Sequence, residues 1–309
     1  MPKDIYLQPH LPDEPWDSEM VLSLVRRHVP GARTVMAVDE SGGEARSYAV
    51  DKDIVLKTQR PNRLRPRTSL KREAFFLNQI AALQPDLPVP RVLGYGHEGP
   101  SVEYTVLTRM PGVALRNAKL DRAARLEIMR RLGQTLRRLH HLPQPPFVES
   151  GLFPGDRSAA DVRRRIEELL EEFSSRIQDE RLAWSLAITP QEVSARTLAL
   201  MPDSDVRVAL HSNPWHEHTF VDPATGQFSG IIDFGDSYIS HPTLDLRRWR
   251  DRGEREALLE GYTSEHPVDD EFLAMWHVAQ VVGDMAAVAG SPALARAAEA
   301  DLEHLLRQV

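Results

Sequence analysis

The chain has 309 residues, of which 41% are hydrophobic and 27% are charged, an ordinary balance for a globular protein with room for two lobes or domains. Its net charge of −7 argues against nucleic acid as a partner, because a phosphate backbone attracts clustered Lys and Arg. Cysteine is absent, which excludes disulfide frameworks and thiolate zinc sites, and the cytoplasm is the expected compartment.

Export and membrane insertion are not expected either. Residues 1–16 contain no apolar stretch flanked by positive charge, as a signal peptide would. We also expect no later segment to approach the roughly 20 apolar residues of a membrane helix. Small molecules are therefore the expected partners, rather than nucleic acid or membranes.

The first 110 residues alternate strand-like and helical patterns. Apolar periodicity and turn residues predict, in chain order, a helix over 18–28, strands over 34–40, 45–51 and 53–58, a helix over 69–83, and strands over 91–98 and 102–110. A small antiparallel sheet with two helices is the simplest arrangement of these elements. Pro111 and Gly112 then indicate a hinge or linker.

The remainder of the chain is mostly helical in pattern. Apolar residues at three- and four-residue steps predict helices over 121–141 and 161–177, and several more within 254–309. Between these helices lies an island of strand-like runs over 206–234, and the polar residues of this part gather there.

The island has a recognisable order of polar residues. It contains HSN at 211–213, then His218 five residues after the Asn, a turn, and GIIDFG at 230–235. This order resembles the catalytic loop of the aminoglycoside phosphotransferase family, in which His-Gly-Asp, a later Asn, a hairpin and Ile-Asp-Phe/Trp-Gly follow one another. The resemblance implies an α/β (α+β) fold of the two-lobed protein-kinase type. It implies a nucleotide-binding β-sheet N-lobe with a C-type helix over 1–110, and a helical C-lobe over 111–309 with the catalytic loop and acceptor pocket.

Upstream positions match the same family in the same order. Lys57 ends a strand-like run and Glu73 follows on the next helix, like the kinase strand lysine and its partner on the C helix. Thr108 to Met110 resembles the family's hinge, whose backbone groups bind the purine edge. Ser47 closes a glycine-containing loop that would cover phosphates through backbone N–H groups. The resemblance thus implies ATP or GTP as the cofactor.

The resemblance also implies a metal site. Asp233 and His218 stand at the two metal-ligand positions, and a carboxylate suits Mg²⁺, which prefers hard oxygen ligands. Members that act on macrolides resemble this chain in having His rather than Asn at the second position, and an imidazole suits Mn²⁺ better than Mg²⁺. Asp245, in the segment HPTLDL, resembles the aspartate that supports the catalytic loop.

Asn213 is the main departure from the family. It stands two residues after His211, at the position of the catalytic base, and an amide cannot accept a hydroxyl proton as a carboxylate does. Such a base contributes about 10²- to 10⁴-fold to the rate. Three explanations stay open: an engineered Asp to Asn change that traps a substrate complex, a natural inactive kinase, or another group that serves as base.

Two simpler interpretations of the charged residues were weighed. His211, His216 and His218 with Glu217 offer ligands that zinc takes, but their spacing matches no zinc-hydrolase motif. The acidic run at 167–172 would attract a cationic substrate, although such a run is more often a solvated helix face.

The function implied by the resemblance is transfer of the γ-phosphate of a nucleoside triphosphate to a hydroxyl group. The acceptor would be an aminoglycoside, a macrolide or a related metabolite, with antibiotic resistance among the roles that fit. The alternative is a catalytically silent protein that binds nucleotide or ligand. The acceptor, the choice of ATP or GTP, and the choice between monomer and homodimer stay open.

Overall fold

The computed structural model describes residues 13–40, 42–60, 69–99, 102–180, 182, 184–290 and 292–307. By internal packing the chain forms two compact units, each assembled from separate stretches. Unit 1 comprises Met1–Lys119, Pro145–Pro154 and His211–Tyr238, and unit 2 comprises Leu120–Gln144, Gly155–Leu210 and Ile239–Val309. These units are not the contiguous lobes expected from the sequence, and the lobe boundary at residue 110 stays a prediction.

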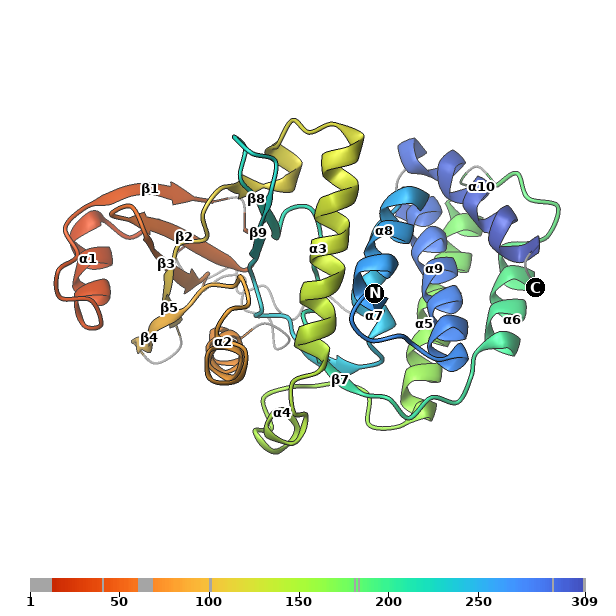
Figure 1. Cartoon of the computed structure of the whole chain (residues 1–309), viewed down its shortest axis with the longest axis horizontal. Helices are drawn as coiled ribbons and strands as arrows, with labels where there is room; N and C mark the ends of the chain where they lie inside the picture. Colours follow the sequence, from red (N-terminus) through yellow and green to blue (C-terminus); the bar gives the residue numbers. More distant parts are fainter. Residues whose placement is uncertain are drawn as a thin grey trace. The chain divides into compact units, whose positions relative to one another are not determined.

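Unit 1 contains the main sheet. Its elements in chain order are α1 (Ser18–Arg26), β1 (Val35–Asp39), β2 (Ala45–Val50), β3 (Ile54–Gln59), α2 (Leu70–Leu83), β4 (Val92–Glu98), β5 (Val102–Thr108), β6 (Val113–Ala114), the 3₁₀ turn η2 (Leu115–Asn117), α4 (Pro145–Glu149), β8 (Thr219–Val221) and β9 (Phe228–Ile231) (Figure 1). The first five strands form an antiparallel sheet in the order β1-β2-β3-β5-β4, and a smaller sheet has the order β6-β8-β9. The predicted antiparallel sheet with two helices is confirmed.

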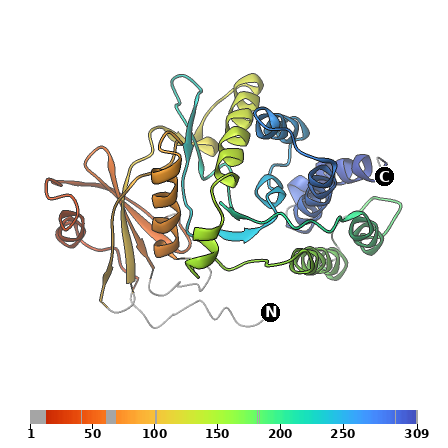
Figure 2. The same ribbon diagram turned by 60° about the horizontal axis from the view of Figure 1, so that its bottom comes forward.

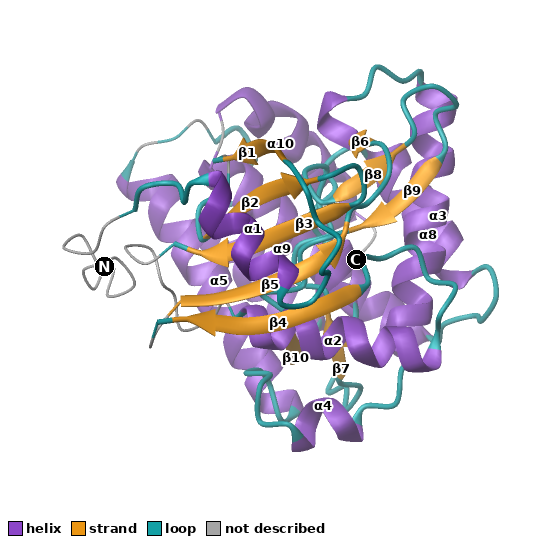
Figure 3. Cartoon of the chain, turned by 90° about the vertical axis from the view of Figure 1, so that its left-hand side faces the viewer, coloured by secondary structure: helices purple, strands orange, loops and turns teal. Residues whose placement is uncertain are grey.

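Helix α1 covers one face of the five-stranded sheet (Figure 3). The helix begins after Asp17 because the carboxylate of Asp17 accepts a hydrogen bond from the Met20 N–H at 2.8 Å. Its apolar stripe, which includes Val21 and Leu24, is fully buried in a cluster with Tyr48 and Leu56 of the sheet. Burial of this kind stabilises the fold by about 25 cal/mol per Å² of apolar surface.

Helix α2 packs near the opposite face, running alongside the strands (Figure 2). Residues alternate between the two faces of a strand, so Ser47, Lys57 and Thr105, which are paired across β2, β3 and β5, share the face that α1 does not cover. The side chain of Ser69 caps α2, and Glu73 lies buried in its first turn. This geometry turns Glu73 toward the strand that carries Lys57.

A cluster of aromatic rings around Phe76 packs α2 within unit 1. The ring centroid of Phe76 lies 4.8 Å from that of Phe147, 5.9 Å from that of Phe153 and 5.0 Å from that of Phe234. Edge-to-face pairs of this kind add about 0.5–1.5 kcal/mol each beyond the area they bury. Helix α2 is thereby tied to α4 and to the segment that carries Asp233.

Unit 2 is mostly helical. Its elements are α3 (Arg122–His140), α5 (Ala159–Asp179), α6 (Pro190–Leu200), β7 (Val208–Leu210), β10 (Tyr238–Ser240), α7 (Thr243–Leu246), α8 (Arg252–Thr263), α9 (Asp270–Gly290) and α10 (Pro292–Arg307); β10 starts at the last residue of unit 1. Helix α3 packs on α8, and α9 packs on α5 and α10. The predicted helices are confirmed within a few residues at each end, whereas α4 and α6 were not predicted as separate elements.

Helix α9 corrects one expectation. It is long and apolar enough to cross a membrane by length and composition, contrary to the prediction that no segment would approach this limit. However, 72% of its most apolar window is buried inside the structure. Such burial is typical of a core helix, because a helix that is apolar all round needs either lipid or protein to cover it.

Candidate functional site

A buried lysine links two carboxylates in unit 1. The Lys57 Nζ donates to Glu73 Oε1 at 3.1 Å and to Asp233 Oδ1 at 2.5 Å. The side chains of Lys57 and Glu73 are 12% and 1% exposed, so this pair is shielded from water. The three residues come from β3, α2 and the segment after β9. The resemblance implies the pair of Lys57 with Glu73, whereas the contact of Lys57 with Asp233 was not predicted.

Burial and ion pairing have opposite effects on the pKa values of the charged side chains in this cluster. Burial alone would lower the pKa of Lys57, but Asp233 and Glu73 outweigh it and hold that pKa above its ordinary value. Burial would likewise raise the pKa of Asp233, but Lys57 and His218 hold it below its ordinary value. The Lys57 ammonium and the Asp233 carboxylate are therefore both charged at neutral pH.

Asp233 is held in an unusual backbone conformation. Its φ of 74° lies in the left-handed region, which Asp and Asn tolerate better than most residues. The next residue, Phe234, donates its N–H to Glu73 Oε1 at 3.2 Å. The turn that aims the Asp233 carboxylate is thus fixed through Glu73, the partner of Lys57.

His218 faces the second oxygen of Asp233. Its Nδ1 lies 2.8 Å from the main-chain oxygen of Asn213, and since a carbonyl can only accept, Nδ1 carries a hydrogen. Its Nε2 lies 3.1 Å from Asp233 Oδ2. The imidazole and the carboxylate therefore converge from two different segments, as two side chains that share one cation would.

His211 is a structural strut of the same loop. Its Nε2 lies 2.9 Å from the main-chain oxygen of Ile232, while its Nδ1 accepts the Asn213 N–H at 3.2 Å. Because one nitrogen faces a carbonyl and the other an N–H, the ring is the neutral tautomer with hydrogen on Nε2. Its ring packs against that of Phe234 with centroids 4.5 Å apart. His211 thus joins the Asn213 loop to the Asp233 segment.

The Asn213 loop has two exceptional features. Ser212 has a φ of 81°, a conformation that suits glycine, the residue the family usually has there. The Asn213 Oδ1 is buried and has no hydrogen-bond partner within the described residues. A buried oxygen without a hydrogen-bond donor costs free energy. The position of the Asn213 side chain therefore destabilises the loop instead of stabilising it.

The predicted hinge segment lies at the end of β5. Thr108 donates its N–H to the Arg91 oxygen at 2.9 Å and accepts the Arg91 N–H with its hydroxyl at 2.8 Å. The Arg109 N–H donates to the Asp53 oxygen at 2.7 Å. The N–H groups of Thr108 and Arg109 are therefore both used inside the protein. Gly112 follows with a φ of 89°, and a Cβ there would lie 2.1 Å from the Val221 oxygen.

The turn between β1 and β2, which includes the loop expected to cover phosphates, is anchored by two arginines that the sequence analysis missed. Arg60 donates to the oxygens of Glu40 and Gly42 and pairs with Asp13 at 2.6 Å. Arg46 pairs with Glu40 at 2.5 Å and with Asp13 at 3.4 Å. These four side chains form an arginine clamp. Ser41 lies outside the described residues.

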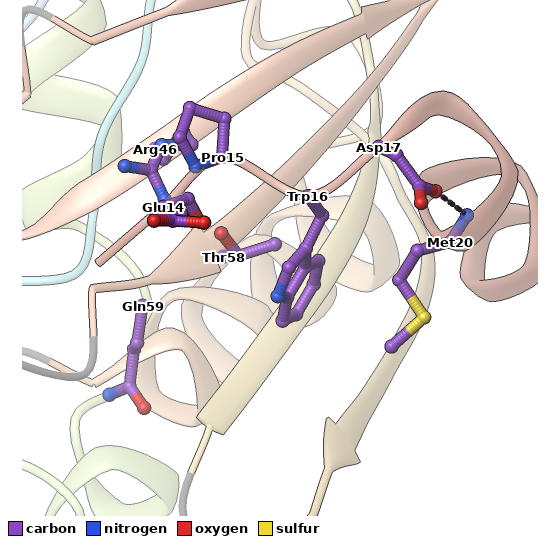
Figure 4. Close-up of a pocket in the computed structure, with 8 residues that line it drawn as sticks. All are labelled: Glu14, Pro15, Trp16, Asp17, Met20, Arg46, Thr58 and Gln59. Atoms are coloured by element: carbon purple, nitrogen blue, oxygen red, sulfur yellow. Dashed lines mark hydrogen bonds between the residues drawn. The ribbon is translucent and has the colours of Figure 1, made fainter. Parts of the chain in front are cut away.

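A cavity of about 370 Å³ in unit 1 includes none of the predicted site residues. Figure 4 shows its lining, which includes Trp16, Arg46 and Thr58. Arg46 and Thr58 are paired on β2 and β3 and therefore point to the α1 face, opposite Lys57. The cavity lies beside the arginine clamp and not at the candidate site.

Ser47 and Asp245 occupy different surroundings. Ser47 is the cross-strand partner of Lys57 and lies on the same face of the sheet. Asp245 is fully buried in unit 2, where its Oδ2 lies 3.0 Å from His140 Nε2, and His140 Nδ1 lies 2.9 Å from the Tyr262 hydroxyl. This network orients the Asp245 carboxylate, and its support of the catalytic loop stays a prediction.

The structure gives no support to a zinc site built from the loop histidines. His216 Nε2 pairs with Glu217 at 3.2 Å, and Glu217 also lies 3.6 Å from Arg116. In the part of the chain that the structure describes, no group of three or more His, Asp or Glu side chains is arranged to hold a metal ion. Among the described residues, the two predicted metal-ligand positions, His218 and Asp233, do lie in contact with each other, at 3.1 Å.

Comparison with known proteins identifies the family. The sequence profile described as the phosphotransferase enzyme family matches residues 36–280, well over half of the chain. The chain belongs to the phosphotransferase enzyme family. The matched range includes every predicted site residue from Ser47 to Asp245.

Solved structures similar to this phosphotransferase-family member support its fold. The macrolide 2′-phosphotransferase MphH from Brachybacterium faecium is 21% identical with a TM-score of 0.57, over 93% of this chain and 98% of that one. The GDP complex of aminoglycoside 2′-phosphotransferase-IIIa is 16% identical with a TM-score of 0.59, over 95% and 98%. The ternary complex of streptomycin, ATP and APH(2″)-IIa is 15% identical with a TM-score of 0.59, over 89% and 90%. These likenesses show a kinase-like fold, an N-terminal antiparallel sheet followed by a mostly helical part.

Proposed function

We propose that this member of the phosphotransferase family binds a nucleoside triphosphate in unit 1 and transfers its γ-phosphoryl group to a hydroxyl of a small molecule. The observation that carries the proposal is the cluster in which Lys57 joins Glu73 to Asp233, with His218 on the far oxygen of Asp233. A lysine buried at this cost, between two acids from different elements, is expected where phosphates must be held. The cytoplasm is the proposed compartment.

Phosphoryl transfer needs positioning and charge neutralisation more than covalent help. Lys57 supplies a fixed positive charge for the phosphates of ATP or GTP, and Glu73 keeps that charge in place because it is itself fixed by Phe234 N–H. The Met110 N–H and the face of the sheet that carries Ser47 complete the proposed nucleotide contacts. ATP or GTP as donor is supported by relatives solved with GDP and with ATP.

The residues present fit a divalent cation with two protein ligands. A carboxylate oxygen of Asp233 and the Nε2 of His218 converge to 3.1 Å, and the Nδ1 hydrogen of His218 is used on the main chain. Mg²⁺ usually takes only one or two protein carboxylates and fills its remaining positions with water and phosphates, and Mn²⁺ accepts imidazole more readily. Such a cation would neutralise charge on the phosphates. Lys57 and His218 would have to release their direct contacts with Asp233.

Asn213 limits the reaction. It lies in the loop that His211 and His218 contact, at the sequence position where the family has its base, and its amide does not take up a proton. We therefore expect tight nucleotide binding with slow transfer. The competing proposal, a silent binding protein, is favoured by the same residue and differs in predicting no transfer at all.

Restoring the acid separates the two proposals. Asn213→Asp and the present protein would be compared for nucleotide consumption and for phosphorylated product, using a panel of aminoglycosides, macrolides and simple hydroxylated metabolites. We expect Asn213→Asp to transfer phosphate about 10²- to 10⁴-fold faster than the present protein, the usual contribution of a general base. Asn213→Ala is the matched control, because it removes the amide without supplying a base.

Nucleotide binding is measured separately. ATP or GTP with Mn²⁺ or Mg²⁺ should raise the midpoint of thermal unfolding, and Asp233→Asn, which keeps the left-handed turn but loses the charge, should abolish that shift. If nucleotide stabilises the protein but Asn213→Asp transfers phosphate to nothing in the panel, the silent binder is favoured. If no nucleotide shifts the midpoint, the site assignment itself is wrong.

A further inference from the structure

A second charged cavity lies in the helical unit 2. It has a volume of about 160 Å³ and is lined by Phe173 of α5, by Arg247, Arg248 and Arg250, and by Val282, Gly283 and Ala286 of α9. Three arginines from one short segment thus line a small cavity together with residues of two helices. The described lining includes no Asp or Glu.

A carboxylate that adjoins the lining is held by another arginine. Asp284 follows Gly283 on α9 but is buried against Arg255, which donates to its two oxygens at 3.0 and 2.9 Å. Arg255 also donates to Asp301 at 2.6 Å. Asp284 and Asp301 are therefore both held by Arg255, and neither belongs to the described lining of the cavity.

The pKa of Arg250 reflects the positive charges of the neighbouring arginines. Burial, together with the neighbouring charges of Arg248 and Arg247, lowers the pKa of Arg250 to about 10 in spite of the opposing charge of Asp284. Its guanidinium donates to the main-chain oxygen of Gly283. A hydrogen bond to a neutral carbonyl holds the group in place but supplies no neutralising charge.

Gly283 of α9 allows the arginine segment to approach the helix closely. A Cβ at position 283 would lie 2.6 Å from the Arg247 oxygen and 3.2 Å from Arg250 Nη1. Glycine inside a helix costs about 1 kcal/mol relative to alanine, so its presence in the middle of α9 indicates that the close approach of the arginine segment is needed. Arg248 adds an unused donor, because its Nε is buried and has no hydrogen-bond partner in the described part of the chain.

We propose that this cavity binds an oxyanion, namely the carboxylate or the phosphoryl group of a small molecule. Guanidinium groups present paired N–H donors that match the spacing of oxygens in both groups, and such charge-assisted hydrogen bonds are about twice as strong as neutral ones. Phe173 provides an apolar wall for the carbon part of the ligand. The site is independent of the proposed phosphotransfer and would stand if that proposal failed.

Isothermal titration of the full-length protein, without nucleotide, with inorganic phosphate and separately with acetate tests the proposal and separates the two oxyanions. At least one should bind, and Arg248→Gln should weaken that binding about tenfold or more, because a charge-assisted donor is lost. Arg131→Gln is the matched control, since Arg131 is 60% exposed on α3 and pairs with Glu127. It should bind like the unmodified protein.

A second variant keeps the test decisive if Arg248→Gln fails to fold. Ala286→Glu places a carboxylate at the cavity lining while it keeps all three arginines, and Ala286→Gln is its neutral isostere. Ala286→Glu should abolish anion binding and raise the unfolding midpoint above that of Ala286→Gln. The proposal is overturned if neither anion binds the unmodified protein. It is equally overturned if Arg248→Gln and Ala286→Glu bind as well as the unmodified protein, which would mean an adventitious ion only.

Discussion

The two units carry charged clusters of opposite balance. In unit 1 a single ammonium, Lys57, faces two acidic side chains, Glu73 and Asp233, and His218 lies on the far oxygen of Asp233. In unit 2 Arg247, Arg248 and Arg250 line one cavity, and Asp284, which follows the lining residue Gly283, pairs with Arg255. The first cluster suits a cation and the second an anion. The balance of positive and negative side chains in a cluster, rather than its number of ion pairs, therefore indicates which kind of ion each unit is expected to bind.

The largest expected effect comes from removing one cation from each cluster. Lys57→Met leaves Glu73 buried without its cation and should destabilise the protein by about 3–5 kcal/mol, the usual cost of an unpaired buried charge. Arg248→Met removes repulsion and an unsatisfied donor, so its effect should stay within about 1 kcal/mol of neutral or be stabilising. Chemical unfolding of both variants measures this contrast, and equal losses would contradict the proposed difference in charge balance.

The next effect concerns the arginine clamp of unit 1. Asp13→Asn removes the charge that both Arg46 and Arg60 contact and should loosen the turn after β1, costing about 1–3 kcal/mol. Nucleotide should then bind several-fold more weakly, in proportion to the lost order of the turn. Asp17→Asn is the control, because it weakens the cap of α1 without touching either arginine.

Titration of ATP and GTP into both variants gives the comparison. If Asp13→Asn and Asp17→Asn change nucleotide affinity equally, the clamp contributes to stability alone and has no part in the nucleotide site.

The smallest effect isolates the backbone of the Asn213 loop. Ser212 has a φ of 81°, so Ser212→Gly should stabilise the protein by about 1 kcal/mol by removing left-handed strain. Ser212→Ala loses the same hydroxyl but keeps the strain, and it should not be stabilising. Thermal unfolding distinguishes the two variants, and equal midpoints would show that the loop stores no strain at this residue.

Much of unit 1 could be predicted from the sequence. Strand-like runs located β2 and β3, and the family resemblance of the residues from His211 to Asp233 implied a site whose side chains the structure brings within hydrogen-bond distances. This was successful because the residues of the cluster follow one another in a fixed order along the chain. The strand, the helix and the hairpin that carry these residues can each be predicted from local sequence patterns, so the chain order of the site residues can be placed on the fold.

The remainder depends on packing that no local pattern records. Asp13 and Arg60 are 47 residues apart, and neither lies in a motif. The arginines that follow α7 line a cavity together with α9, which approaches them closely at Gly283. Likewise, the donors of Thr108 and Arg109 proved to be used inside the protein, which backbone pairing alone determines. Long-range contacts of this kind require the folded structure.

The hydrogen bond from His218 to residue 213 has one further consequence. Because the imidazole is held by the main-chain oxygen of Asn213, this hydrogen bond does not require a particular side chain at position 213. An exchange of Asn for Asp there would therefore change the acid-base character of the loop while it keeps the bond that orients His218.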